Sequence, residues 1–482
     1  MPRRLFVIAM RLYRLCALPL CILLLLLQPQ ARAYSLLTHE ELIDLTWQDS
    51  IVPLLLARYP GLTPAQLREA HAYAYGGCVV QDIGYYPYGD QLFSDLTHYV
   101  RSGAFVVSLF RNAHNADELA FAVGALSHYI GDSVGHPEAV NVSVPVEFPK
   151  LRRRYGPVVS FAEGKHQHVQ TEFAFDIDQL AHNRMAPLGF GRWIGLRVPM
   201  AQLAAAFYQT YGIADFDGYH GSKWLNVGEY RFAVRSLIPH IAFAVTVLHR
   251  HDEPVDLDTP DTLKIEREVA AVSAANNWPS YRKHSGIETH LLAALLFVLP
   301  KVGPFAIVNV KGPTQQTEAA YMHSVMLSLD ALRASLHRFT PPHARAGGPP
   351  RHNAGPQAPR APLPADDRRE RRQELHDPLH PLPNRDLDTG RVVLPGGYSL
   401  TDSTYASLLH RLTRHPRQPI PPGIARDIQA YYANLDAPFT TKRKPRRWAQ
   451  VLADLKTLTA MPTSSEPEPF PTYDEDAALQ QP

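Results

Sequence analysis

The fold of this 482-residue chain is decided by the stretch Ala125-Leu126-Ser127-His128-Tyr129-Ile130-Gly131-Asp132-Ser133-Val134-Gly135-His136. This stretch closes an apolar helical segment over 116–134, which Asn115 is placed to cap. His128 and Asp132 are four residues apart, so both side chains project from one face of that helix. An imidazole and a carboxylate one turn apart suit zinc, and the apolar surroundings favour a metal site over an isolated polar residue.

The next histidine, His136, stands between Gly135 and Pro137. A glycine before it and a proline after it indicate that the helix ends there. His136 could therefore turn toward a second metal ion. A second pair, His168 and Glu172, is again four residues apart within a helical segment over 165–180. Taken alone, such a pair also fits a solvated helix face.

Two upstream segments strengthen the metal hypothesis. A carboxylate, Asp82, lies in a glycine-flanked turn after a helix, within Gly76-Gly77-Cys78-Val79-Val80-Gln81-Asp82-Ile83-Gly84. His98 follows in Asp95-Leu96-Thr97-His98-Tyr99. Together with the two helical pairs, these residues supply the mixed imidazole and carboxylate set that zinc prefers in proteins.

Helical spacing of apolar residues dominates the chain from residue 39 to about residue 335. The helical segments lie near 40–57, 63–75, 116–134, 165–180, 199–211, 226–249, 262–276, 286–299 and 315–337. Two short β-branched runs, 142–146 and 306–310, are each either a small strand or an extended loop. We therefore predict an all-α, multi-helix domain over 34–340.

The N-terminus has the layout of a secretory signal peptide. Basic residues precede the apolar run Leu15–Leu27, and the small-residue triplet Ala31-Arg32-Ala33 follows it. The run is short for a membrane span. We expect residues 1–33 to be removed by cleavage after Ala33, which makes Tyr34 the first residue of a secreted or periplasmic protein.

The mature chain is nearly neutral and holds one cysteine. Its 48 basic residues less the five arginines of 1–33 leave 43, against 46 acidic residues, so its net charge is −3. This balance argues against duplex nucleic acid as a partner. Cys78 remains alone after cleavage, so no intrachain disulfide can form.

The composition changes at residue 341. From 341 to 383 the chain holds eleven prolines and seven arginines but no aromatic residue, so it cannot bury enough apolar surface to offset its ordering entropy. We predict a disordered linker over 341–395 and a disordered acidic tail over 461–482. Between them, 396–460 is predicted to be a small helical region, with helical periodicity over Tyr405–Leu412, Ile424–Leu435 and Trp448–Leu458.

The order and rough spacing of these motifs resemble the secreted zinc-dependent phospholipase C family. The shared elements, from 34 to about 180, are Thr38-His39 after a processed N-terminus, Asp82-Ile83, His98-Tyr99 and the pairs His128/Asp132 and His168/Glu172. The helical remainder to about 335 fits the family fold, and 341–482 lie outside the resemblance. Single-strand-specific zinc nucleases share the same trinuclear metal plan, so the resemblance identifies the metal site better than the substrate.

The resemblance implies three zinc ions, and all nine implied ligand residues are present. The first ion would be held by Asp82, His98, His128 and Asp132. The second would share Asp132 and take His39 and the free amino group and carbonyl of Tyr34. The third would take His136, His168 and Glu172.

Two features depart from the family pattern. Family members usually begin with Trp where this chain has Tyr34, which backbone ligation tolerates. Three residues separate Asp132 from His136, whereas the bacterial phospholipases typically have five. The shorter spacing resembles the catalytic region of glycosylphosphatidylinositol-specific phospholipase D, so the head group and the bond cleaved both stay open.

Clustered zinc suits phosphodiester hydrolysis, because it neutralises phosphate oxygens, lowers the pKa of an attacking water toward about 7 and stabilises the leaving alkoxide. Asp82 is both a ligand and the candidate catalytic base. Tyr85, Tyr86 and Tyr88 could form an aromatic wall for a choline-type cation, or they could simply pack in a loop.

The leading hypothesis is an exported trinuclear-zinc phosphodiester hydrolase that cleaves phospholipid head groups, with a membrane surface as a candidate place of action. A single-strand zinc nuclease of the same metal plan is the alternative enzyme. A non-catalytic zinc-containing surface or binding protein is the alternative from another class. For that alternative, the linker and the helical tail would be the working parts. For the leading hypothesis, we expect removal of 341–482 to spare catalysis on a soluble substrate. The sequence does not indicate an oligomeric state.

Overall fold

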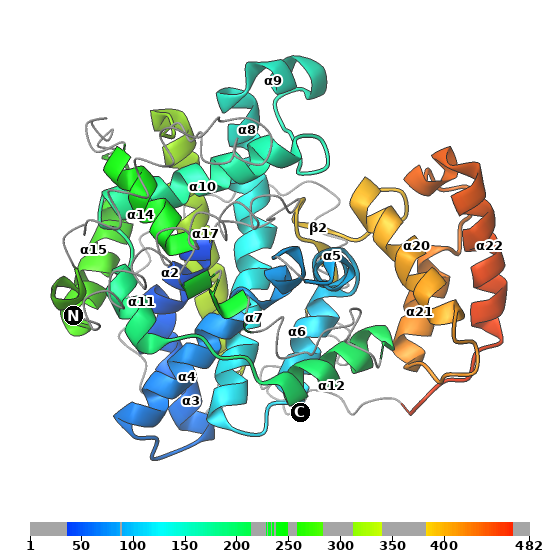
Figure 1. Cartoon of the computed structure of the whole chain (residues 1–482), viewed down its shortest axis with the longest axis horizontal. Coiled ribbons are helices and arrows are strands. Elements are labelled where there is room, and N and C mark those ends of the chain that lie inside the picture. Colours follow the sequence, from blue (N-terminus) through cyan, green and yellow to red (C-terminus); the bar gives the residue numbers. More distant parts are fainter. Residues whose placement is uncertain are drawn as a thin grey trace, which may run out of the picture.

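The computed structural model describes residues 36–86, 89–213, 258–282, 312–339 and 382–465, together with parts of 228–248. The fold is all-α, as predicted (Figure 1). The helices are α2 (Leu36–Thr46), α3 (Val52–Arg58), α4 (Pro64–Gly77), α5 (Gln91–Tyr99), α6 (Ser102–Arg111), α7 (Ala116–Gly135), α8 (Asn141–Glu147), α9 (Pro149–Tyr155), α10 (Lys165–Ala181), α11 (Leu188–Ile194), α12 (Met200–Tyr211), α14 (Ile238–Leu248), α15 (Pro260–Ala275), α17 (Gln315–Phe339), α20 (Ser399–Thr413), α21 (Pro422–Tyr431) and α22 (Pro445–Thr459).

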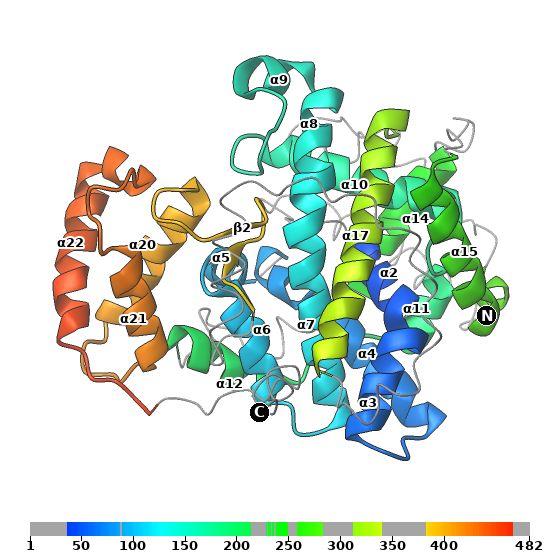
Figure 2. The same cartoon turned by 180° about the vertical axis from the view of Figure 1, so that it is seen from behind.

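Helix α7 is the central element of the fold. It packs against α2, α4, α6 and α17, and Figures 1 and 2 show these helices on different sides of it. Its start follows the sequence prediction, because the Asn115 side chain accepts a hydrogen bond from the backbone N–H of Glu118 at 3.0 Å. Nearly every α7 side chain is buried, as its continuous apolar composition requires.

Helices α4 and α7 approach very closely. A Cβ atom at Gly124 would lie 2.1 Å from the carbonyl oxygen of Ala74, so only glycine fits at this crossing. Because the two helices are so close, the turn that follows α4 packs directly against α7. That turn is the 3₁₀ segment η2 (Val80–Tyr85), which holds Asp82.

The helix does not end at His136, contrary to our expectation. It widens into the π-helical turn η3 (His136–Val140) and continues as α8. A π turn tolerates Pro137 because the hydrogen-bond register shifts there, and such turns recur at functional sites. The β-branched run 142–146 is therefore helical rather than a strand, because its packing against α10 and α17 outweighs its strand propensity.

Several short helices were not predicted, among them α5 and α6. Helix α5 begins at Gln91 after Asp90, whose side chain accepts a hydrogen bond from the backbone N–H of Leu92. The helical segment predicted over 286–299 and the β-branched run at 306–310 lie outside the described residues.

The C-terminal part of the structure, residues 382–465, starts earlier than predicted. Residues 341–381 of the expected linker lie outside the described residues, whereas residues 382–465 are described and form strands and helices. Strands β1 (Arg385–Asp386) and β2 (Arg391–Val392) form an antiparallel pair that packs on α5 and α6 through β1. The linker prediction is therefore wrong for 382–395, where contacts with the helical domain supply the burial that the local composition lacks.

Helices α20, α21 and α22 occupy the region where helical periodicity was predicted. They lie to one side of the larger helical domain, joined to it through α5 and α12 (Figure 1). Among the helices of the described ranges, none has the length and apolar character needed to cross a bilayer. Cys78 is a buried free cysteine.

Candidate metal centre

Helix α7 presents His128 and Asp132 toward the interior, where both side chains are fully buried. His128 Nε2 lies 3.1 Å from Asp132 Oδ2, as the spacing of four residues predicts. The other ring nitrogen, Nδ1, lies 2.9 Å from the carbonyl oxygen of Cys78 and is held by it. The imidazole ring is therefore held with Nε2 toward Asp132.

Asp82 and His98 approach from the turn η2 and from α5. His98 Nε2 lies 3.3 Å from Asp82 Oδ1 and 3.4 Å from His128 Nε2. Gln81 anchors the turn, because its side-chain amide donates to the carbonyl oxygen of Ala125 on α7 at 2.9 Å. The structure thus brings together side chains from three separate elements.

His39, on α2, approaches the opposite side of Asp132. Its Nε2 lies 3.2 Å from Asp132 Oδ1, whereas His98 and His128 face Oδ2. Asp132 therefore presents one oxygen to each of two groups of histidines, which is the arrangement a bridging carboxylate requires. Helix α2 is held in place by Asp176 of α10, which accepts hydrogen bonds from the backbone N–H groups of Leu37 and Thr38.

His136, His168 and Glu172 form a second buried group. His168 Nε2 and His136 Nε2 lie 3.0 Å and 3.4 Å from Glu172 Oε1. His136 Nε2 also lies 3.7 Å from Asp132 Oδ1, so the two groups are neighbours. The π turn that starts at His136 sets the position of this residue relative to α7 and α10.

The spacing of these atoms fits zinc. Ligand atoms about 2.0 Å from one tetrahedral zinc ion lie about 3.3 Å from each other. The nitrogen and oxygen atoms above lie 3.0–3.7 Å apart. Both carboxylate oxygens of Asp132 and of Glu172 are buried without a hydrogen-bond partner among the described residues. Such atoms need a cation, and the donor set suits zinc.

Burial dominates the electrostatics of His168 and Glu172. It lowers the pKa of His168 to about 3 and raises the pKa of Glu172 well above its usual range. Burial also acts to raise the pKa of Asp132, but the adjacent His128 and His136 outweigh it and hold that pKa well below its ordinary value. Metals bind a neutral imidazole and an ionised carboxylate, so the pKa shifts of His168 and Asp132 favour metal binding, whereas Glu172 needs an adjacent cation to ionise.

A carboxylate that we did not predict, Asp388, lies behind His136. It belongs to the turn between β1 and β2 and is buried, with its Oδ1 3.5 Å from His136 Nδ1. The turn-forming run Asp388-Thr389-Gly390 before Val392 could have indicated a hairpin. Nothing local in the sequence indicates its contact with His136, which arises only from the packing of the C-terminal part.

Some predicted site residues lie outside the described residues, namely Tyr34 and Tyr88. Tyr85 is buried, with its ring centroid 5.5 Å from that of His98, and its hydroxyl donates to Asp95 at 3.1 Å. Tyr86 is partly buried and packs edge-on against Tyr230. Their role in substrate binding stays a prediction.

A further cluster, Asp178, His182 and Glu318, has its side chains within metal-binding distance of each other. Ordinary polar contacts account for it. Glu318 accepts a hydrogen bond from Arg184 at 2.9 Å, and His182 Nδ1 lies 2.9 Å from the backbone oxygen of Asp178. Since a cation already neutralises Glu318, we assign no metal to this cluster.

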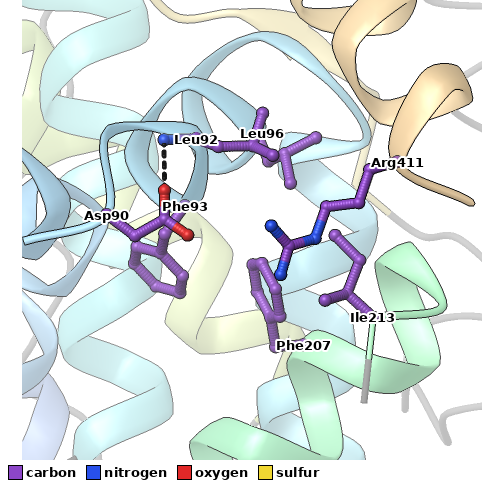
Figure 3. Close-up of a pocket in the computed structure, with 7 residues that line it drawn as sticks. All are labelled: Asp90, Leu92, Phe93, Leu96, Phe207, Ile213 and Arg411. Carbon is purple, nitrogen blue, oxygen red and sulfur yellow. Dashed lines mark hydrogen bonds between the residues drawn. The ribbon is translucent and has the colours of Figure 1, made fainter. Parts of the chain in front are cut away.

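A small pocket lies between α5, α12 and α20, away from the metal-ligand candidates (Figure 3). It is lined by Asp90, Leu92, Phe93, Leu96, Phe207, Ile213 and Arg411, and none of the predicted site residues belongs to this lining. The side chain of Arg411 reaches over it from the C-terminal part. The pocket therefore marks an interface between the two parts of the chain rather than the centre.

Comparison with known protein families identifies a family for part of the chain. Residues 38–221 match the family model described as zinc dependent phospholipase C. No curated protein and no solved structure matches the chain. The matched region contains every predicted ligand that the structure describes, from His39 to Glu172. It ends well before Asp388.

Proposed function

Residues 38–221 belong to the zinc-dependent phospholipase C family, as the sequence resemblance predicted, and on this premise we propose that the protein is an exported phospholipid hydrolase with three zinc ions. The observation that carries the proposal is the shared position of Asp132. One of its oxygens faces His39 and the other faces His98 and His128. This arrangement supports at least two adjacent ions rather than one.

In this proposal the first ion would be held by Asp82, His98, His128 and Asp132. The second would be held by His39 and by the amino group and carbonyl of Tyr34, with Asp132 as a common ligand. The third would be held by His136, His168 and Glu172. Bound zinc would supply Lewis-acid neutralisation of the phosphate and lower the pKa of the attacking water.

The chain itself orients and protects the reacting groups. Asp82 lies at the edge of the first group, with its Oδ1 buried and without a hydrogen-bond partner in the described part of the chain, so it can orient or deprotonate a water. The carbonyl oxygens of Ser94 and Cys78 hold His98 and His128 from behind. These contacts preorganise the imidazoles, so little reorganisation accompanies the reaction.

Export and activation are coupled in this proposal. A free amine binds zinc whereas an amide nitrogen is a poor ligand, so cleavage after Ala33 creates a ligand at Tyr34. Asp176 supports this role, because it fixes the first turn of α2 through Leu37 and Thr38. Extending the mature chain by one residue ahead of Tyr34 should abolish activity while circular dichroism shows an intact fold. Unchanged turnover would show that the amino group of Tyr34 is not a zinc ligand.

The decisive experiment measures zinc per chain and reads the N-terminal residue in the same secreted sample. We expect close to three zinc ions, with Tyr34 first. That sample is then incubated with phosphatidylcholine vesicles and, separately, with single-stranded DNA. Release of phosphocholine and diacylglycerol supports the phospholipase C assignment. Phosphatidic acid would indicate cleavage of the other phosphoester bond, DNA hydrolysis would favour the nuclease, and zinc without turnover would favour a binding protein.

A further inference from the structure

The turn between β1 and β2 places a carboxylate directly behind a predicted zinc ligand. Asp388 Oδ1 lies 3.5 Å from His136 Nδ1, while His136 Nε2 faces Glu172 and Asp132. The other Asp388 oxygen accepts hydrogen bonds from the hydroxyls of Tyr99 at 3.0 Å and Tyr398 at 2.6 Å. Both sides of the Asp388 carboxylate are therefore engaged, and its orientation is determined.

The hairpin that carries Asp388 is bonded to the helical domain at several points. The Asn141 side chain donates to the backbone oxygen of Asp388 at 2.7 Å, and the backbone N–H of Leu387 donates to the carbonyl oxygen of His98 at 3.1 Å. Ser102 and Arg385 exchange two hydrogen bonds. The segment is thus attached next to the predicted ligands themselves.

The shapes of the hairpin and of the π turn are also complementary. Pro137 has no N–H to donate, so the carbonyl oxygen of Ser133 loses the partner it would have in a regular helix. Gly390 packs on that carbonyl, and a Cβ atom there would lie 2.2 Å from the oxygen. With a φ of 67°, Gly390 also adopts a conformation that favours glycine.

Two of the other predicted histidine ligands, His98 and His128, have a contact that corresponds to the one between Asp388 and His136. His98 Nδ1 lies 2.7 Å from the carbonyl oxygen of Ser94, and His128 Nδ1 lies 2.9 Å from that of Cys78. In each case the nitrogen remote from the centre is held by an oxygen from the matched region. His136 has its corresponding oxygen on Asp388, which comes from the C-terminal part. A carboxylate in this position fixes the tautomer and ring orientation and makes Nε2 more basic.

We propose that Asp388 is a positioning residue for His136, so that the C-terminal part of the chain completes the zinc centre of the family domain. This inference rests on the proposed function, because it takes His136 as a zinc ligand. Asp388 touches neither the substrate nor the reacting atoms. It acts by holding the imidazole with Nε2 toward Glu172.

The test compares Asp388→Asn with Asp386→Asn in the full mature chain. Both changes remove one buried carboxylate from the same hairpin, but Asp386 accepts hydrogen bonds from Thr401 and Thr389 and does not lie behind His136. Chelator competition should show about 10- to 100-fold weaker binding of one zinc ion in Asp388→Asn. Asp386→Asn should stay within about threefold of the unaltered chain. Equal zinc affinity in all three proteins would overturn the proposal.

A double-mutant cycle separates positioning from a general loss of structure. If Asp388 acts through His136, adding Asp388→Asn to His136→Ala should weaken zinc binding no further. Additive losses would overturn the proposal. If circular dichroism shows that Asp388→Asn does not fold, Tyr398→Phe is the alternative variant. It removes one hydrogen-bond donor to Asp388 and should weaken the binding of the same zinc ion by a smaller factor. Unchanged affinity in Tyr398→Phe would then count against the proposal.

The same measurements separate failure of the Asp388 proposal from failure of the proposed function. If the unaltered chain binds no zinc, the proposed function fails and the comparison of variants has no baseline. If the unaltered chain binds zinc and hydrolyses phospholipid but Asp388→Asn equals it, only the role of Asp388 is rejected.

Discussion

Two carboxylates, Asp132 and Glu172, each face several histidines of the candidate metal centre. Asp132 faces four histidines with its two oxygens, and Glu172 faces one of these, His136, together with His168. None of these carboxylate oxygens has a hydrogen-bond partner within the described ranges. Buried carboxylates without donors are costly unless a cation neutralises them, so these residues fit a metal-binding centre.

His168 and His166 offer a matched pair of substitutions on α10. His168 is buried against Glu172, whereas His166 lies two positions earlier on the exposed face. We expect His168→Ala to lose one zinc ion per chain and at least about 100-fold in turnover, because a lost ligand costs more than a lost orienting group. His166→Ala should keep both. Metal analysis and initial rates check this, and full zinc content in His168→Ala would remove it from the ligand set.

Asp176 should control stability rather than chemistry. It accepts hydrogen bonds from the N–H groups of Leu37 and Thr38 and from the Thr38 hydroxyl. Asp176→Ala strands these buried donors, so we expect the free energy of unfolding to fall by about 2–4 kcal/mol. Urea denaturation measures this. A change below about 0.5 kcal/mol would show that water or a neighbouring group replaces the carboxylate.

At the scale of elements, the continuation of α7 through η3 into α8 is the main departure from local sequence signals. Gly135 and Pro137 predict a helix end, and 142–146 has strand propensity. The chain instead shifts to a π turn at His136. That shift keeps α8 packed on α10 and α17 and leaves the Ser133 carbonyl open to Gly390 of the hairpin.

Gly390→Ala tests the docking of the hairpin on this turn. The new Cβ would meet the Ser133 carbonyl, in addition to the strain of a φ of 67°. Gly61 is the control, because its φ is 85° but nothing lies within 4 Å of an added Cβ. We expect Gly61→Ala to cost about 1 kcal/mol and Gly390→Ala clearly more. Thermal unfolding compares them, and equal shifts would argue against a tight contact.

At the scale of the whole molecule, the C-terminal part packs against helices of the domain that carries the candidate metal centre. Strand β1 packs on α5 and α6, α20 packs on α5, and α21 packs on α12. Figure 2 shows β2 between the helical domain and α20. This packing argues against the expectation that removal of 341–482 spares catalysis on a soluble substrate.

Two truncations test this at the scale of the molecule. A chain ending at residue 381 exposes the faces of α5, α6 and α12 and loses Asp388, so we expect aggregation or at least about tenfold weaker zinc binding. A chain ending at residue 465 keeps the described C-terminal helices and should behave as the full chain. Activity of the shorter chain within threefold of the full chain would show that the C-terminal part is dispensable.

The sequence by itself determined the helical class of the fold and the pairing of His128 with Asp132 and of His168 with Glu172, because both depend on local spacing. Apolar residues at helical intervals define α4, α7, α10 and α17, and pairs four residues apart share a helix face whatever the tertiary context. Only the tertiary structure decided how His39, Asp82 and the two pairs converge, how the chain passes Pro137 and where Asp388 lies. Those outcomes depend on packing between segments far apart in the chain, which no local pattern encodes.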